Sequence, residues 1–386
     1  MDLSRHKHVN IGFFVIDYSA AGGVERVTAN LMSQFLVNGF QNLYLLSLKS
    51  VKGKPSMNYP ESAELKIFDN ENTGKKFFAD ELAAYLKQKR IKHLIFQADN
   101  MTIALEVLKG AKAAGCKAYP QYHGSPYAYL RKYSEANKPN LEKVLFAKIT
   151  YPFKKKKIKK FIQNSEEGVF CVSQGSADEM KFLFKNDKKI AKKIKVLRNP
   201  IILNGTDAAK EKLITLVSRL ENKHKNAFLA VKAWALIAHK FPDWKLVILG
   251  DGSLRQKMEN FCKEQNINNV VLPGFVSNVD EILGKSAVSL NVSNCEGFPM
   301  GVAEAIVQKN VMVITDSDGG AKDMVIHGNT GLVSPKNDEE KLAANIEKVI
   351  LNENLRNNLA ENAFKRLENM AANDNFHTWT KILFKN

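Results

Sequence analysis

Cysteine is scarce in this sequence: four residues among 386, and no two of them form a CxxC pair. Disulfide frameworks and zinc sites use closely spaced cysteines, so neither is expected to organise this chain. A reducing compartment suits such a composition best. Long apolar runs are absent as well. The first apolar stretch, residues 11–16, is too short for a membrane span or a signal-peptide core, so we expect a cytoplasmic chain.

Acidic residues are outnumbered by basic ones, 40 against 57, which gives a formal net charge of +17. This excess favours an anionic partner: nucleic acid, an anionic membrane surface or a phosphorylated ligand. Charge alone does not choose among them. The hydrophobic content of 45% and the charged content of 25% are ordinary for a soluble enzyme. Domains usually contain about 100–200 residues, so this length predicts two.

Short apolar stretches alternate with helical patterns along the chain, which predicts parallel α/β sheets. The strands expected in the first half are 9–16, 44–48, 93–97, 118–122 and 168–172. A second series comprises 213–217, 245–249, 269–272, 288–292 and 311–314. We predict two Rossmann-like domains, residues 1–200 and 201–365, whose parallel sheets face across a cleft. A C-terminal helix within 366–386 is expected to pack back on the first domain. Ligands of such sheets bind beyond the carboxyl ends of the strands.

Two glutamates with seven residues between them give the strongest functional signal. Glu296 falls in the loop after the predicted strand 288–292, and Glu304 lies inside the helix expected over 301–309. The residues after Glu296 read Gly-Phe-Pro-Met-Gly. A loop that opens a helix presents free backbone N–H groups and a positive dipole end, which suit a diphosphate. Carboxylates accept hydrogen bonds from sugar hydroxyls.

This motif resembles the hallmark of the family 4 glycosyltransferases, retaining enzymes of the GT-B fold, in which EGFP precedes a helix ending in Glu-Ala. The resemblance covers nearly the whole chain and is densest over 213–333. It implies that Glu296 touches hydroxyls of the donor sugar and that Glu304 binds the ribose of the nucleotide. The neighbouring residues that it assigns to donor binding are Phe298, Pro299, Met300 and Gly301.

A basic pair follows the first strand of the second domain. Arg219 stands in Val-Ser-Arg-Leu, and Lys225 lies six residues later. Both side chains match phosphate oxygens, and the resemblance implies that they clamp the donor diphosphate. The glycine that usually precedes this arginine is a serine here. Lys223 and His224 are alternatives for the lysine, but Asn226 after Lys225 is similar to the family's pattern.

Three further residues are assigned to the first domain. Gly22 and Gly23 follow the first strand and open the first helix, where glycine lets a backbone approach a ligand closely. The turn lacks the GxGxxG of dinucleotide-binding proteins. The resemblance implies that it faces the donor phosphates and that His123, at the end of strand 118–122, approaches the transferred sugar. His93 and His239 are expected to be structural.

The sequence Asp316-Ser317-Asp318 has the form of the metal-binding DxD of another glycosyltransferase class. It follows the glutamate-bearing helix, where the GT-B pattern has an ordinary turn, so we interpret it as turn chemistry. We therefore expect no metal ion and no cofactor other than the nucleotide-sugar substrate.

A lysine-rich segment lies within residues 144–161. The run comprises Lys154, Lys155, Lys156 and Lys157, and apolar residues are interspersed around it. Pro152 is expected to interrupt the segment. Such a segment can lie on an anionic membrane surface, at about 1 kcal/mol per basic residue, or it can be a solvated helix face. We predict peripheral association with the inner face of the cytoplasmic membrane.

Together these features predict a retaining glycosyltransferase that moves a hexose or N-acetylhexosamine from a nucleotide diphosphate sugar, expected to be a UDP-sugar. The acceptor would be a glycan or a lipid-linked glycan in the assembly of surface polysaccharide or lipopolysaccharide. Two alternatives remain open: a GT-B epimerase or hydrolase of nucleotide sugars, and a basic nucleic-acid-binding protein. The second needs basic residues interleaved with aromatic ones. The lysines here are concentrated in one segment, so no nucleic-acid partner is expected.

Overall fold

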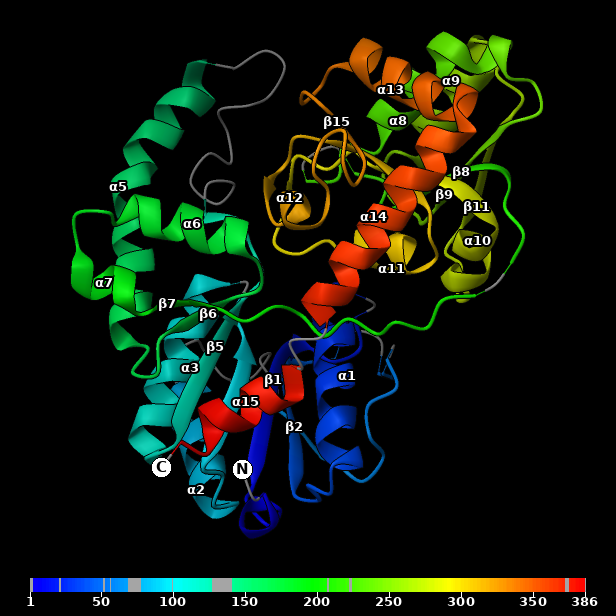
Figure 1. Cartoon of the computed structure of the whole chain (residues 1–386). Helices are drawn as coiled ribbons and strands as arrows, with labels where there is room; N and C mark the ends of the chain where they lie inside the picture. The colour runs from blue at the N-terminus through cyan, green and yellow to red at the C-terminus, as the bar shows by residue number, and fades with distance from the viewer. Residues whose placement is uncertain are drawn as a thin grey trace. The chain divides into compact units, whose positions relative to one another are not determined.

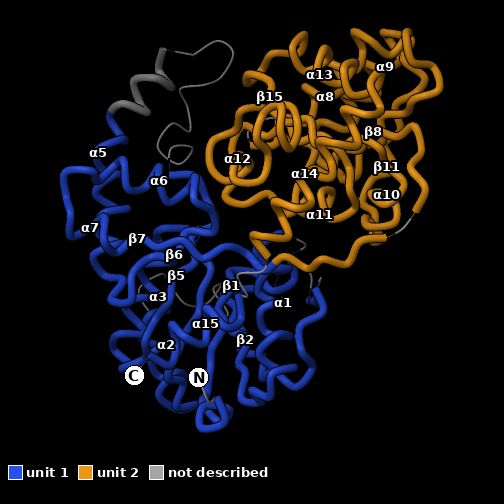
Figure 2. Tube along the Cα trace, in the orientation of Figure 1, with its two compact units in different colours: residues 1–200, 374–386 blue, residues 201–373 orange. Residues whose placement is uncertain are grey.

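The computed structural model describes residues 3–20, 22–50, 53–55, 57–68, 78–98, 100–126, 141–206, 208–221, 224–371 and 375–385, with the backbone alone over 141–148. The chain forms two compact units (Figure 2). Unit 1 contains residues 1–200 and 374–386, and unit 2 contains residues 201–373. The return to unit 1 comes later than the expected boundary at residue 365, because helix α14 (Glu353–Ala371) stays in unit 2.

Unit 1 is built on a seven-stranded sheet whose paired strands run parallel. Its strands are β1 (Ile11–Asp17), β2 (Leu43–Lys49), β3 (Glu64–Ile67), β4 (His93–Gln97), β5 (Lys117–Tyr122), β6 (Val169–Cys171) and β7 (Ile194–Val196). Their order is β3-β2-β1-β4-β5-β6-β7. The order reverses between β1 and β4, and ligands of parallel α/β sheets bind at such a switch point.

Helices cover both faces of this sheet (Figure 1). They are α1 (Gly23–Val37), α2 (Phe78–Gln88), α3 (Met101–Ala114), α5 (Leu141–Asn164), α6 (Gln174–Leu183), α7 (Lys188–Lys192) and α15 (Asn375–Leu383), beside a short 3-10 helix (Ser4–His6). Strands covered on both faces are apolar throughout, which explains their Leu, Ile and Phe content. On one face the fully buried Trp379 of α15 packs against Tyr119 and Phe170, so the last helix completes the core of unit 1.

Unit 2 contains a six-stranded parallel sheet in the order β10-β9-β8-β11-β13-β15. Its strands are β8 (Glu211–Val217), β9 (Lys245–Leu249), β10 (Val270–Gly274), β11 (Ser286–Asn291), β13 (Val311–Thr315) and β15 (Leu332–Ser334); β12 (Cys295–Glu296) and β14 (Asp318–Gly319) form a separate pair. The helices besides α14 are α8 (Phe228–Ile237), α9 (Arg255–Glu264), α10 (Val279–Lys285), α11 (Met300–Val307), α12 (Ala321–Met324) and α13 (Glu339–Leu351), with a 3-10 turn at Ala238–Lys240. The order reverses between β8 and β11, so a second ligand site is expected at this switch point.

The predicted strands all form, and β4 and β9 have the predicted bounds. The missed strands are short: β3, β7 and β15 have three or four residues each, and β12 and β14 have two each. The expectation that Pro152 interrupts the basic segment is wrong, because α5 continues through it. Proline inside a helix costs about 3 kcal/mol. Burial of Ile158, Phe161 and Ile162 in the core offsets that cost.

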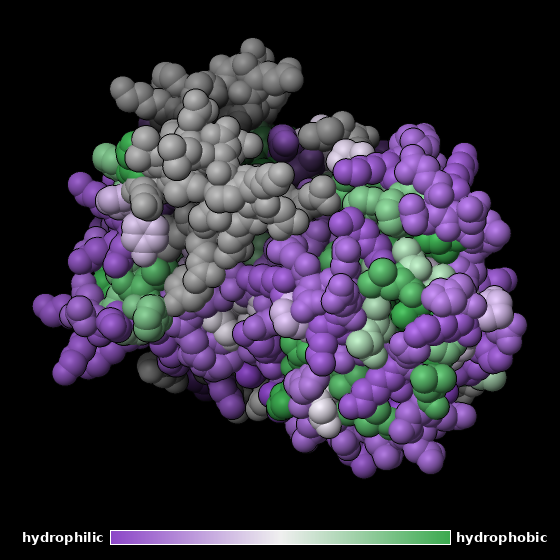
Figure 3. Space-filling view, turned by 90° about the horizontal axis from the view of Figure 1, so that it is seen from above, coloured by the Kyte–Doolittle hydropathy of each residue, from purple (hydrophilic) through white to green (hydrophobic). Residues whose placement is uncertain are grey.

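Within the described residues, no helix is both long enough and apolar enough to span a membrane. On the face seen in Figure 3, hydrophilic side chains cover most of the described surface, and hydrophobic ones gather in smaller patches between them.

Candidate functional site

The carboxyl edge of the unit 2 sheet brings a lysine and a glutamate into direct contact. Lys225 Nζ donates a hydrogen bond to Glu296 Oε1 at 2.6 Å. Ser293 Oγ donates to the same oxygen at 2.7 Å, and Thr315 in turn donates to the Ser293 carbonyl at 3.0 Å. Two donors on one oxygen hold the carboxylate in a single orientation. Lys225 and Glu296, predicted from separate motifs, therefore belong to one site.

The backbone around Glu296 is fixed by the small β12–β14 pair. Cys295 and Glu296 pair in parallel with Asp318 and Gly319, and Gly320 N–H donates to the Glu296 carbonyl at 2.9 Å. Gly319 has a φ of +89°, a left-handed conformation that favours glycine. A side chain at this position would strain β14, the strand that pairs with the one carrying Glu296.

Arg219 lies in the loop after β8, the neighbour of β11 in the sheet. Its side chain is 71% exposed, and its guanidinium lies 3.4 Å from the Glu221 carboxylate. The start of α11 lies beside the same strand end, because a Cβ added to Gly301 would be 3.6 Å from the Val217 Cβ. The loop of Arg219 and the N-terminus of α11 therefore belong to one edge of unit 2.

The remaining predicted donor residues lie along the loop and first turns of α11. Phe298 is buried, and Pro299 caps the helix at its N-terminus. Met300, Gly301 and Glu304 are half-buried. Phe298 thus packs into the protein and shapes the loop, while Met300 and Glu304, one turn apart on α11, share a partly exposed face.

Cys295 adjoins the glutamate, and its thiol has a raised pKa. His224 Nδ1 lies 3.3 Å from its Sγ. Burial, followed by the nearby Glu296 and Asp318 carboxylates, raises the pKa of Cys295 to about 12. A thiol with such a pKa forms little thiolate near neutrality, so it is a poor nucleophile there.

The Asp316-Ser317-Asp318 turn carries two carboxylates that are each paired with a lysine. Asp316 lies 2.7 Å from Lys322 Nζ, and Asp318 lies 3.0 Å from Lys336 Nζ. Among the residues that the structure describes, no group of three or more His, Cys, Asp or Glu side chains is arranged to hold a metal ion. Metal independence itself stays a prediction.

In unit 1 the predicted glycine turn opens α1. Gly22 is the N-cap residue with an extended backbone, φ −123° and ψ 171°, so it does not need a left-handed conformation. The Glu25 Oε2, at the end of a flexible side chain, lies where a Cβ on Gly22 would point, so a larger residue here would require Glu25 to move. Glu25 is buried in the first helical turn, where a carboxylate is favourable to the helix dipole. Gly23 is the first residue of α1.

His123 directly follows β5 and is held by the end of the neighbouring strand β4. Its Nε2 is hydrogen-bonded to Gln97 Oε1, and Gln97 Nε2 donates to Thr28 Oγ1 of α1 at 3.0 Å. The His123 side chain is partly exposed. Surrounding protein nevertheless lowers its pKa to about 3 through burial, so the imidazole is neutral at physiological pH. His93, predicted to be structural, is buried and hydrogen-bonded to Tyr119.

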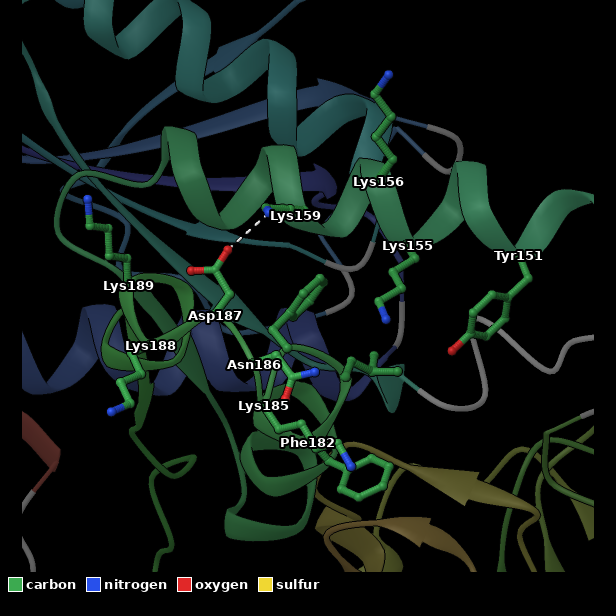
Figure 4. Close-up of a pocket in the computed structure, with 12 residues that line it drawn as sticks. Tyr151, Lys155, Lys156, Lys159, Phe182, Lys185, Asn186, Asp187, Lys188 and Lys189 are labelled. Atoms are coloured by element: carbon green, nitrogen blue, oxygen red, sulfur yellow. Dashed lines mark ion pairs between the residues drawn. The ribbon is translucent and has the colours of Figure 1, made fainter.

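A basic groove lies elsewhere on unit 1, between α5 and the segment that links α6 to α7 (Figure 4). Among the described residues, six lysines and the rings of Tyr151, Phe182 and Phe184 line it, and Asp187 is the one carboxylate of that lining. The lysines are Lys155, Lys156, Lys159, Lys185, Lys188 and Lys189. Asp187 lies 3.0 Å from Lys159 Nζ, so a large positive excess remains.

The predicted lysine run does not act as one surface. Lys155 lies over the Phe184 ring in the groove, with Nζ 5.7 Å from the ring centroid. Lys156 is exposed at the edge of the groove, and its side chain extends away from Asp187 and Phe182 (Figure 4). Lys157 donates to Thr102 Oγ1 of α3, and Lys154 is half-buried. At least one of the four lysines, Lys157, thus bonds to another side chain of unit 1.

Comparison with known proteins identifies the second unit. Residues 203–366 match the family model of glycosyl transferases group 1. This part of the chain is therefore similar to that family. A Campylobacter jejuni α-1,4-N-acetyl-D-galactosaminyltransferase, named for an undecaprenol-diphosphate-linked glycan, is 30% identical over 222 residues, which are 55% of this chain and 61% of the relative. A Bacillus subtilis poly(glycerol-phosphate) α-glucosyltransferase is 31% identical over 186 residues, 48% of this chain and 27% of that protein. The chain thus spans less than two thirds of either relative.

A solved structure of Anabaena HepE in complex with UDP superposes with a TM-score of 0.74 at 14% identity, covering 97% of this chain and 99% of that one. At this identity the likeness shows the fold alone. The predicted fold is confirmed: two α/β units with parallel sheets, as in the GT-B glycosyltransferases.

Two features of the sequence around Arg219 and Lys225 now have physical explanations. The serine before Arg219 is tolerated because the backbone of Ser218 has no positive φ angle. Asn226, after Lys225, has a φ of +49°, a left-handed conformation that only glycine and asparagine adopt readily. A glycine or asparagine after the lysine therefore lets the chain turn sharply and direct Lys225 toward Glu296.

Sequence reasoning missed several residues of these sites. Ser293 follows β11 and Thr315 ends β13, both at the carboxyl edge of the sheet. This position is the signal that could have identified them. Gln97 ends β4, so its position at a strand end could have identified it in the same way. Gly250 and Gly252 lie against the backbone of the Arg219 loop: side chains there would collide with the Ser218 and Leu220 carbonyls.

Proposed function

We propose that this chain is a metal-independent, retaining glycosyltransferase that moves a hexose or N-acetylhexosamine from a UDP-sugar to a glycan or lipid-linked acceptor. The Lys225–Glu296–Ser293 cluster at the switch point of unit 2 carries the proposal. It joins a cation suited to phosphate and a carboxylate suited to sugar hydroxyls. The match of residues 203–366 to the family model of glycosyl transferases group 1 supports it.

In this proposal unit 2 binds the donor. Arg219, Lys225 and the backbone N–H groups at the start of α11 bind the diphosphate. The Glu296 carboxylate accepts hydrogen bonds from hydroxyls of the sugar, and Glu304 accepts them from the ribose. Lys225 is mostly buried and paired with Glu296, whereas Arg219, which pairs with Glu221 at 3.4 Å, is 71% exposed. Arg219 is therefore the cation more readily available to an incoming phosphate.

The transfer step needs no oxidant and no cofactor. The bond between the anomeric carbon of the sugar and the β-phosphate oxygen breaks, and a bond forms from that carbon to the acceptor oxygen on the same face. The proton of the acceptor hydroxyl passes to the departing phosphate. Negative charge grows on the β-phosphate as the first bond breaks. Fixed cations there stabilise the transition state more than the ground state.

A thermal-shift screen of UDP-, GDP- and ADP-sugars tests donor binding without knowledge of the acceptor, because a ligand that binds the folded state raises the melting temperature. We expect UDP-sugars to stabilise the full chain most. No stabilisation by any nucleotide sugar would contradict the proposal. Release of free sugar or of an epimer from the stabilising donor, at the same rate with and without acceptors, would favour a hydrolase or epimerase.

We further propose that α5 brings unit 1 to an anionic membrane surface. Ile149 and Phe153, one turn apart, are 57% and 72% exposed, and Lys156 and Lys160 follow on the same side of the helix. Phe182 of α6, which lines the basic groove, is also 60% exposed. Exposed apolar side chains beside lysines are typical of segments that lie in a lipid headgroup layer. The named substrate of the Campylobacter relative is lipid-linked, which supports a membrane acceptor.

A further inference from the structure

Three side chains from different elements form a hydrogen-bonded chain beside the switch point of unit 1. His123 follows β5, Gln97 ends β4, and Thr28 lies in the second turn of α1. Gln97 and Thr28 are buried, with exposed fractions of 3% and 0%. Beyond the bonds from His123 to Gln97 and from Gln97 to Thr28, Thr28 Oγ1 bonds to the backbone carbonyl of Val24 at 3.0 Å.

The carbonyl at the end of this chain fixes the direction of every bond in it. A carbonyl oxygen only accepts, so the Thr28 hydroxyl donates its single hydrogen to Val24. Thr28 Oγ1 must then accept from its other neighbour, and the amide nitrogen of Gln97 supplies the hydrogen. The other end of that amide is its oxygen, which also only accepts. The hydrogen between Gln97 and His123 therefore resides on His123 Nε2.

The opposite arrangement loses a hydrogen bond. If Gln97 turned its amide around, its oxygen would need the Thr28 hydrogen, and the Val24 carbonyl would lose that donor. The amide nitrogen would then face His123 Nε2, which would have to give up its own hydrogen. Thr28 is fully buried, so no solvent reaches it to replace the lost bond.

We infer that Gln97 and Thr28 are positioning residues that hold His123 as the neutral Nε2–H tautomer and leave its Nδ1 as a hydrogen-bond acceptor for a hydroxyl of the transferred sugar or of the acceptor. The role given to Nδ1 rests on the proposed glycosyltransferase function, but the tautomer does not. The low pKa of His123, about 3, agrees with a ring that orients a hydroxyl and does not carry its proton, since a base that weak takes up little proton near neutrality.

Nitrogen NMR of histidine-labelled full-length protein tests the tautomer directly, because protonated and unprotonated ring nitrogens differ widely in chemical shift. The chain has eight histidines, and the signals lost in His123→Asn assign this one. We expect wild type to show a hydrogen on Nε2 alone. Thr28→Val removes the fixed donor and acceptor at nearly constant volume, and should give a mixture of tautomers. Thr28→Ser keeps the hydroxyl and should restore the wild-type spectrum.

A hydrogen on Nδ1 in the wild-type protein would overturn the inference, and so would an unchanged spectrum in Thr28→Val. Turnover provides the second readout, with the donor that stabilises the wild-type protein. Thr28→Val should lower kcat at least fivefold with a smaller change in KM, and Thr28→Ser should recover most of it. Equal kcat in all three proteins would remove the positioning role. If wild type turns over no nucleotide sugar, the proposed function fails while the tautomer assignment is still decided by NMR.

Discussion

Lys225 Nζ and Glu296 Oε1 lie 2.6 Å apart, and only 24% and 12% of the two side chains are exposed. The cation proposed for the donor phosphate is thus already neutralised by the carboxylate proposed for the donor sugar. When a donor binds, Lys225 must therefore interact with both the Glu296 carboxylate and the donor phosphate. The pair therefore couples recognition of the nucleotide to recognition of the sugar.

Glu296→Gln should separate these two functions. The amide keeps the shape of the side chain but releases Lys225 from its ion pair, so binding of UDP alone should stay the same or become tighter. Turnover should fall at least tenfold, because a hydrogen bond to a charged group contributes about 1.5–3 kcal/mol. Calorimetry with UDP and steady-state kinetics measure the two effects. A loss of UDP affinity that parallels the loss of turnover would argue against this role of the pair.

Arg219→Ala should lower turnover at least tenfold, because charge that grows on the leaving phosphate loses a fixed cation. The side chain is 71% exposed, so thermal stability should change little: exposed substitutions shift it by about 0.5 kcal/mol or less. Lys212→Ala is a matched control. It removes an exposed cation near the opposite end of β8, where Lys212 pairs with Asp243, and it should leave kinetics unchanged. Near-normal turnover of the Arg219 variant would remove it from the mechanism.

Activity should persist in EDTA. Asp316 and Asp318 are each engaged by a lysine, and the proposed stabilisation of the phosphate uses Arg219 and Lys225. The measurement is the initial rate after exhaustive chelation, with and without added manganese. Complete loss of activity in EDTA that manganese restores would show that the DxD sequence, or another site, holds a metal ion.

Replacing Lys154–Lys157 by glutamine should weaken flotation with vesicles that contain phosphatidylglycerol. Each exposed lysine near such a surface contributes about 1 kcal/mol, or roughly fivefold in affinity. Single substitutions should differ: Lys156→Gln should weaken binding more than Lys157→Gln, because Lys157 is bonded to Thr102. Glutamine at the unit 2 lysines Lys212, Lys240, Lys257 and Lys263 removes the same charge and should have a smaller effect. Unchanged flotation of the first variant would refute the membrane role of α5.

Unit 1 should lose stability as the pH falls below about 6.5. Burial first, and then nearby Lys117, His6 and Lys92, lowers the pKa of His93 from 6.5 to about 4. The unfolded chain therefore binds more protons than the folded one between these values, and the stabilisation present above 6.5 is lost on the way down to 4. The slope is about 1.4 kcal/mol per pH unit for each such group. Urea unfolding across this range should show a smaller slope for His93→Gln than for wild type, while His239→Gln, an exposed control, should not change it.

The fold could be predicted from the sequence where periodicity is strong. Strands such as β4 and β9 have buried apolar residues next to polar turns, and both have the predicted bounds. The strands β3, β7 and β15 could not be predicted, because three or four residues carry too little pattern to be distinguished from a loop. The continuity of α5 through Pro152 could not be predicted either, since it depends on burial of its second half against α3 and the sheet.

The candidate site, like the fold, could be predicted from the sequence only in part. Glu296 and Lys225 could be named from local motifs, but their mutual contact depends on β8 and β11 being neighbours, which a linear pattern does not state. Ser293, Gln97 and Thr28 act by supporting other side chains, and their residue types alone carry no signal for that role. The identity of the lysine was open among adjacent residues. The left-handed Asn226 that follows Lys225 explains why that position carries the contact.

The central claim is that Lys225 and Arg219 recognise a diphosphate in unit 2, and the most direct test compares the affinities of UDP and uridine. Uridine lacks the diphosphate but keeps the base and ribose. Calorimetry on wild type, Arg219→Ala and Lys225→Met/Glu296→Gln, which removes both members of the pair and leaves no unpaired buried charge, measures the ratio of the two affinities. The account predicts that wild type binds UDP much more tightly than uridine, and that each variant reduces this preference about tenfold or more without weakening uridine binding. The same preference for UDP in all three proteins would contradict it.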